Sequence, residues 1–307
     1  MIKKILFTIL TVLLGLVFIF SALTKLYPIE LFELTLIDLK VSNWATAPVI
    51  ARLMIASEFL IGGLLILNIN LKKFTLKATI AVLVFFTIYL IIQLAVEGNQ
   101  GNCKCFGNVL KMSPLESIIK NLVMLLIAVI LYIWHKGFNL PFKKIIIPVI
   151  CLTSLALPFI LNPPDFIMAY QSRQETVGYK MNLDTLYNSP DIKKPELELR
   201  KGKHILAFMS LTCSHCKVAA YKMHVIKEED PEISFYFIFN GDLKNLQPFY
   251  NETKTSDIPH MILNGKRFVD LGGYIMPSIV FLNNSIVEQK TDYLNLSEEK
   301  LKLWYNN

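Results

Sequence analysis

Residues 204–216 read HILAFMSLTCSHC, a mostly apolar run that ends just before two cysteines spaced as Cys-x-x-Cys. The run from His204 to Leu211 predicts a buried strand, and the residues from Cys213 to about Lys227 have the pattern of a helix. Unpaired amides and the helix dipole stabilise a thiolate at such a helix start. The stretch therefore predicts a redox-active pair, with Cys213 as nucleophile and Cys216 as resolving thiol.

A zinc site is the alternative interpretation of a Cys-x-x-Cys pair. Structural zinc takes four ligands, and the soluble region contains no second pair of this kind. The histidines at 215, 224 and 260 lack the spacing of a zinc knuckle. We therefore expect thiol chemistry and no metal.

The chain beyond the pair alternates expected strands and helices. The expected elements are a strand at 233–239, a helix at 243–250, a hairpin of 278–282 with 285–289, and a last helix at 297–304. Pro277 stands directly before the hairpin, where a proline caps a strand or occupies a cis turn. This order predicts an α/β sandwich domain.

In this order of elements the region 197–307 resembles the thioredoxin superfamily. The resemblance implies that Pro277 is a cis proline against the Cys213 sulfur, and that Met276 offers backbone hydrogen bonds to a bound substrate. The separation of Cys213 from Pro277 exceeds that in minimal thioredoxins, which implies an inserted element near 247–270 that sets partner choice. A strand-edge proline is the alternative for Pro277.

The two residues between the cysteines tune the redox potential. His215 takes the position that histidine has in the DsbA family of periplasmic oxidants, whose reduced form is stabilised. This favours an oxidising pair, although Ser214 replaces the proline of those oxidants. A solvated His215 without effect on the potential is the alternative.

The region before this domain is much more apolar. The chain has 307 residues, 53% of them hydrophobic, which is too apolar for an ordinary soluble protein. Five stretches have the length of a transmembrane helix, at 5–23, 49–67, 74–96, 115–134 and 145–161. We expect a membrane domain over 1–162 and a linker with one short helix over 163–196. A cleaved signal peptide is the alternative for the first stretch, whose apolar run is longer than usual for one.

The positive charges predict the orientation of these spans. Lysines cluster before the first span, between the second and third, and between the fourth and fifth, at positions 3, 4, 72, 73, 77, 136, 143 and 144. Positive loops stay in the cytoplasm, so we expect a bacterial inner-membrane protein with a cytoplasmic N-terminus and a periplasmic C-terminal domain. The net charge of +7 comes largely from residues beside apolar runs, which argues against nucleic-acid binding.

A second cysteine pair, Cys103 and Cys105, lies in the loop between the third and fourth spans. Cysteines separated by one residue close a strained and therefore reactive ring, and Lys104 favours the thiolate at either one. The CKCFG segment resembles the MauE family, related to DoxX proteins, as do FSALTKL at 20–26 and the pattern of Glu58 before Gly62-Gly63-Leu64. The resemblance implies disulfide handling during maturation of exported proteins. Lys104 departs from the glycine usual in the family.

Glu58 would be costly in hydrocarbon, so we expect it to face the bundle interior. It is a candidate proton relay or quinone-headgroup ligand, in an intramembrane polar site with Ser21 and Lys25. A structural pairing with Arg52 or Lys25 is the alternative.

Three further residues of the membrane region carry no expected function. Arg52 and Lys120 lie near span ends and are expected to snorkel. Cys151 is expected to be a small buried residue.

Two dithiols on one side of a membrane predict a relay between Cys213 and the Cys103/Cys105 disulfide, made intramolecular by the tether. A reductive electron conduit needs a cysteine pair reachable from the cytoplasm, and the sequence has none there. Elimination therefore favours net oxidation or isomerisation of the thiols of cysteine-containing exported clients, with a membrane quinone as candidate electron acceptor. The alternatives are a non-catalytic, membrane-anchored assembly factor that uses the thioredoxin fold for docking, and a reductive electron conduit.

Overall fold

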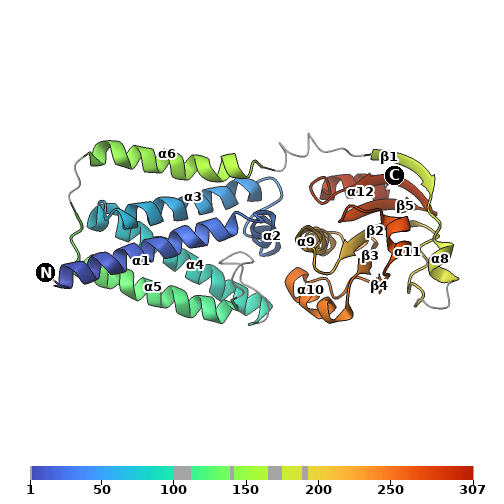
Figure 1. Cartoon of the computed structure of the whole chain (residues 1–307), viewed down its shortest axis with the longest axis horizontal. Coiled ribbons are helices and arrows are strands. Elements are labelled where there is room, and N and C mark those ends of the chain that lie inside the picture. Colours follow the sequence, from blue (N-terminus) through green and yellow to red (C-terminus); the bar gives the residue numbers. More distant parts are fainter. Residues whose placement is uncertain (1, 100–111, 139–141, 165–174, 189–192, 307) are drawn as a thin grey trace. The chain divides into compact units, whose positions relative to one another are not determined.

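The computed structural model describes residues 2–99, 112–138, 142–164, 175–188 and 193–306. The chain divides into two compact units, Met1–Pro164 and Asp165–Asn307. The first unit is helical, and the second is built around a β-sheet (Figure 1). This confirms the predicted class, a multi-span helical membrane bundle followed by an α/β thioredoxin-like domain.

Long apolar helices make up the N-terminal unit. They are α1 (Ile2–Lys25), α3 (Ala47–Ile66), the π-helical turn η1 (Leu71–Thr75) running into α4 (Leu76–Glu97), α5 (Pro114–Trp134) and α6 (Lys143–Leu161). Within the described ranges, five helices are long and apolar enough to cross a membrane. They also expose large apolar side chains, for example Leu13, Ile88, Leu126 and Leu152. An outer surface of this kind suits lipid rather than water, and the unit is a membrane bundle.

A short helix that the sequence did not predict, α2 (Glu30–Asp38), joins α1 to α3. Residues 31–37 of this helix are all buried, with apolar and polar side chains on every side. A helix that is buried all round shows no amphipathic stripe. The periodicity that normally reveals a helix is therefore missing from α2.

Helices α1 and α3 meet at two glycines. A Cβ atom on Gly15 would lie 2.8 Å from the carbonyl oxygen of Gly62, and one on Gly62 would lie 2.8 Å from the side chain of Ile19. Small residues allow membrane helices to approach closely enough for their backbones to touch. This contact holds the first two spans together.

Replacing Gly15 with alanine should force α1 away from α3, because the new methyl group meets backbone atoms that cannot rotate away. We expect a loss of about 1–3 kcal/mol in the free energy of unfolding, as for other overpacked sites. Denaturant unfolding of the full chain in mixed micelles, followed by helical circular dichroism, measures it. Gly63→Ala is the matched control, since its methyl group would meet only the side chain of Ile150, at 3.3 Å. Equal stability of the two variants would contradict the prediction.

The described part of the C-terminal unit forms a six-stranded sheet in the order β1-β6-β5-β2-β3-β4. The strands are β1 (Glu175–Lys180), β2 (Lys203–Ser210), β3 (Phe235–Asn240), β4 (His260–Ile262), β5 (Ser278–Asn283) and β6 (Ile286–Thr291). Strand β2 pairs parallel with β3 and antiparallel with β5, and β5 pairs antiparallel with β6. The three central strands β2, β3 and β5 are buried almost throughout, which explains their continuous apolar runs.

Helices cover both faces of this sheet (Figure 1). They are α8 (Asp184–Tyr187), α9 (Ser214–Glu229), the 3₁₀ turn η2 (Leu243–Asn245), α10 (Leu246–Thr253), α11 (Lys266–Gly272) and α12 (Glu298–Asn306). On one face Phe208 packs against Phe268 of α11, in a cluster that also includes Leu186 of α8. On the other face Phe239 packs against α10 and Phe281 against Trp304 of α12. Strand β2, which leads into the cysteine pair, therefore lies at the centre of a rigid layered core.

Two edge strands lie outside the elements that the sequence predicted. Strand β1 falls in the expected linker and pairs with β6, where the register is interrupted between Thr176 and Tyr179. Strand β4 falls in the expected insertion and has only three residues. Their partners come from distant segments, so local sequence carries little signal for them.

Candidate functional site

The two cysteines of the Cys-x-x-Cys pair have different environments. Cys213 is the N-cap of α9, is half-buried, and its sulfur accepts a hydrogen bond from the Cys216 amide at 3.3 Å. Cys216 is fully buried, and its sulfur accepts from the Ser210 amide at 3.4 Å. Both are free thiols in this structure. Only Cys213 is open to attack from outside the domain.

Burial also separates the two thiols chemically. It raises the pKa of the Cys216 thiol strongly, and the hydrogen bond with Cys213 raises it further, against a smaller opposing effect of the Ser210 amide. A thiol of this kind stays protonated at neutral pH. Because the thiolate is the reactive form, Cys213 is the candidate nucleophile and Cys216 the candidate resolving thiol.

A cis peptide bond joins Met276 to Pro277, directly before β5. Strand β5 pairs with β2, with Ser278 opposite Phe208, so this turn belongs to the sheet that carries the cysteine pair. Pro277 is buried, whereas Tyr274 and Ile275 are 90% and 84% exposed. Two apolar side chains therefore project into solvent just before the cis proline.

The residues between the cysteines are both exposed, but His215 is not simply solvated. Its ring stacks on Tyr293, with ring centroids 5.2 Å apart and planes 24° apart. Tyr293 lies in the segment after β6, and no sequence motif links it to the cysteine pair. Only the fold brings the two aromatic rings together.

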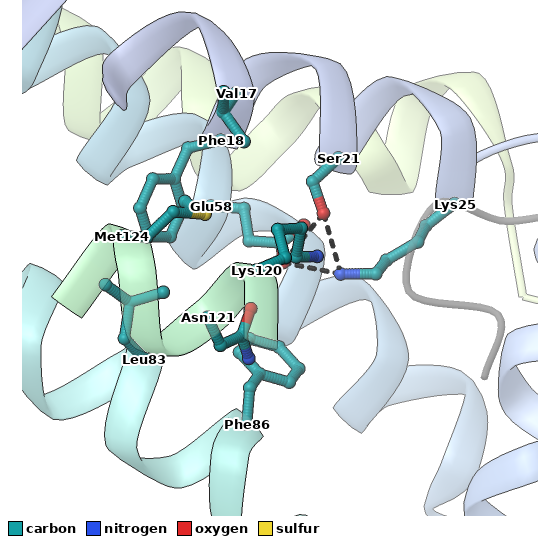
Figure 2. Close-up of a pocket in the computed structure, with 10 residues that line it drawn as sticks. All are labelled: Val17, Phe18, Ser21, Lys25, Glu58, Leu83, Phe86, Lys120, Asn121 and Met124. Carbon is teal, nitrogen blue, oxygen red and sulfur yellow. Dashed lines mark hydrogen bonds and ion pairs between the residues drawn. The ribbon is translucent and has the colours of Figure 1, made fainter. Parts of the chain in front are cut away.

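The three residues predicted as an intramembrane polar site come together in the bundle (Figure 2). The Lys25 ammonium lies 2.5 Å from Glu58 Oε1 and 3.1 Å from the Ser21 hydroxyl, which itself lies 3.3 Å from Glu58 Oε1. Lys25 and Glu58 are 4% and 3% exposed, and the ammonium also lies 4.7 Å from the centre of the Phe86 ring. Glu58 therefore pairs with Lys25.

A small cavity adjoins this ion pair (Figure 2). Its volume is about 30 Å³, and Lys120 and Asn121 also line it, together with the apolar side chains of Val17, Phe18, Leu83, Phe86 and Met124. Glu58 Oε2 is buried and has no hydrogen-bond partner. A polar cavity of this volume accommodates one water molecule.

Two expectations for the membrane region were wrong. Arg52 does not snorkel: it is fully buried and bonds to Glu33 of α2 at 2.5 Å and to the carbonyls of Pro48, Asn162 and Pro163. The carboxylate and carbonyls replace the water that a snorkelling side chain would seek. Cys151 is exposed on α6 rather than buried, because few residues of α6 face the bundle.

The remaining predictions concern the loop cysteines and metal binding. Cys103, Lys104 and Cys105 lie outside the described residues. Among the residues that are described, no group of three or more histidine, cysteine or acidic side chains is arranged to hold a metal ion.

Fold and site define a class: a membrane protein in which a helical bundle precedes a thioredoxin-like domain with a Cys-x-x-Cys pair. Residues 3–134, less than half of the chain, match the family described as "Methylamine utilisation protein MauE". Protein TlpB of Flavobacterium psychrophilum is 24% identical over a match that covers 82% of this chain and 81% of that protein.

The C-terminal part is similar to solved thioredoxin-like structures. StoA from Bacillus subtilis is 20% identical and matches over 42% of this chain and 97% of its own, with a TM-score of 0.29. DsbF of Mycobacterium tuberculosis is 18% identical and matches over 34% of this chain and 79% of its own, with a TM-score of 0.30.

Proposed function

We propose that the protein is a membrane-bound thiol-disulfide oxidoreductase that acts on the cysteines of exported proteins. The observation that carries the proposal is the asymmetry of the pair. Cys213 is accessible at a helix start, while Cys216 behind it is buried and has a raised pKa. An accessible nucleophile with a protected resolving thiol is the arrangement that disulfide exchange requires.

In the oxidising direction, a client thiolate attacks the Cys213 sulfur of the Cys213–Cys216 disulfide. The Cys216 thiolate leaves and, because its pKa is raised, takes up a proton. A second client thiolate then attacks the client sulfur of the mixed disulfide and releases the Cys213 thiolate. The client has gained a disulfide, and the pair has become a dithiol.

We assign substrate binding to the turn around the cis proline. Met276 and Pro277 would hold an extended client segment through the Met276 backbone, beside the Cys213 sulfur. The exposed side chains of Tyr274 and Ile275 give the same turn an apolar contact for the client.

Regeneration of the disulfide is assigned to the loop of the membrane domain. Cys213 attacks the Cys103–Cys105 disulfide, and Cys216 resolves the resulting mixed disulfide, which leaves Cys103 and Cys105 as a dithiol. The proposal places both pairs on the periplasmic side of a bacterial inner membrane, where the charge distribution favours them. A membrane quinone remains the candidate acceptor for the electrons of the loop dithiol.

The test is a Cys216→Ala variant of the full chain in membranes. Without its resolving thiol, Cys213 should stay linked to whatever it has attacked, and non-reducing electrophoresis followed by mass spectrometry identifies the adducts. We expect exported proteins among them, and also Cys103 or Cys105 of the same chain. Adducts with clients but never with the loop would exclude the internal relay. An absence of any adduct would exclude exchange itself.

A second candidate function is docking without catalysis. The projecting Tyr274 and Ile275 support it, because exposed apolar side chains of this size mark interaction surfaces. A docking protein would keep its effect on client maturation after loss of Cys213, whereas the proposed enzyme would not.

A further inference from the structure

Helix α9, which starts at the cysteine pair, makes two contacts with one residue after β6. The His215 ring stacks on the Tyr293 ring, and the Lys222 ammonium donates to the Tyr293 carbonyl oxygen at 3.1 Å. His215 and Lys222 are two helical turns apart and so lie on one face of α9. The side chain and the backbone of Tyr293 are therefore both held against the helix that presents the nucleophile.

The segment that carries Tyr293 is itself well ordered by hydrogen bonds. The Asp292 carboxylate accepts from the Asn295 amide at 2.9 Å and from the Asn295 side chain at 3.0 Å. The Leu296 amide donates to the Asp292 carbonyl at 3.1 Å, and Asn295 and Leu296 are both buried. Tyr293 is thus presented from a closed turn anchored in the core.

Two charged side chains of these segments have partners of their own. Lys217 of α9 pairs with Glu252 of α10 at 2.9 Å. The Asp292 carboxylate is occupied by Asn295, as described above. His215 is the ionisable side chain that lies between the two cysteines in sequence. The Tyr293 contact decides the position of its ring.

We propose that Tyr293 is a positioning residue for the redox pair, which holds the His215 imidazole at the first turn of α9, the helix that Cys213 caps. This inference rests on the proposed function. An imidazole fixed on this turn adds its dipole to those of the amides at the helix start, and the reduced form of the pair is stabilised. Stabilising the reduced form makes the disulfide a stronger oxidant. Without the stack, the exposed His215 side chain moves into solvent and the stabilisation is lost.

The equilibrium with glutathione tests this directly. The full chain in detergent micelles, with Cys103, Cys105 and Cys151 replaced by alanine, retains only one dithiol. We expect Tyr293→Ala to shift the equilibrium constant toward the protein disulfide by about 3- to 10-fold. A tenfold shift corresponds to a change of about 30 mV in the reduction potential. Tyr293→Phe keeps the ring and should stay within about twofold of the parent.

A double-mutant comparison separates positioning from general damage. His215→Ala should shift the equilibrium in the same direction, and adding Tyr293→Ala to it should have no further effect, because the imidazole is already gone. Tyr293→Leu fills the space without an aromatic ring, and it should shift the equilibrium in the same way as Tyr293→Ala. It takes the place of the alanine variant if that variant proves unstable.

Two outcomes would overturn the proposal. One is an equilibrium constant for Tyr293→Ala and Tyr293→Leu equal to that of the parent. The other is a full additional shift when Tyr293→Ala is combined with His215→Ala. The glutathione equilibrium needs no client protein, so it remains measurable if the proposed function on exported proteins fails. A failure of this inference can therefore be distinguished from a failure of the proposed function.

Discussion

Replacing Cys213 with serine should abolish thiol-disulfide exchange at the Cys213–Cys216 pair. The reason lies in the partner thiol: Cys216 is fully buried and its pKa is raised, so it cannot take over the attack on an external disulfide. We expect a rate below about 1% of the parent, since the thiolate is the nucleophile and serine does not form one at neutral pH. Reduction of a model disulfide by the reduced chain in micelles, with Cys103 and Cys105 replaced by alanine, measures this rate.

The matched control for this substitution is Cys151→Ser, which removes an exposed cysteine outside the pair. It should leave the rate unchanged. A Cys213→Ser protein that retained more than a few per cent of the parent rate would contradict the assignment of the nucleophile. Full client maturation in cells by this variant would favour the docking function instead.

The second large effect is a loss of stability, which we expect when Arg52 is replaced. Its guanidinium, fully buried, joins α3 to Glu33 of α2 and to the carbonyls of Asn162 and Pro163 after α6. Arg52→Met would remove the guanidinium that donates to the Glu33 carboxylate and to these carbonyls. Breaking a buried ion pair from one side costs about 3–5 kcal/mol. We expect a loss of that size in the free energy of unfolding in mixed micelles.

A double substitution tests the physical reason. Adding Glu33→Leu to Arg52→Met removes the uncompensated carboxylate, so it should restore part of the lost stability. The carbonyls near Asn162 stay without the guanidinium, so the rescue should be incomplete. A double variant less stable than Arg52→Met alone would show that the ion pair is not the source of the effect.

Much of the fold could be predicted from the sequence because the features that define these elements lie among neighbouring residues. Apolar stretches of membrane-spanning length, a strand leading into a Cys-x-x-Cys helix, and a proline before a hairpin each predict an element by themselves. The cis bond at Pro277 is present in the structure, and the predicted core strands overlap β2, β3, β5 and β6. The helix α2 and the edge strands β1 and β4 were missed, since burial all round or a distant pairing partner defines them. The short helix α11 was missed as well.

The sequence by itself determined that this protein has a membrane bundle, a thioredoxin-like domain and two candidate thiol pairs. Spacing and hydropathy are properties of neighbouring residues, so they can be read along the chain. Only the tertiary structure decided that Glu58 pairs with Lys25, that Arg52 is buried against Glu33, and that Tyr293 stacks on His215. Each of these contacts joins different segments of the chain. The partner of a side chain therefore depends on which elements pack against it, and the local sequence does not define that packing.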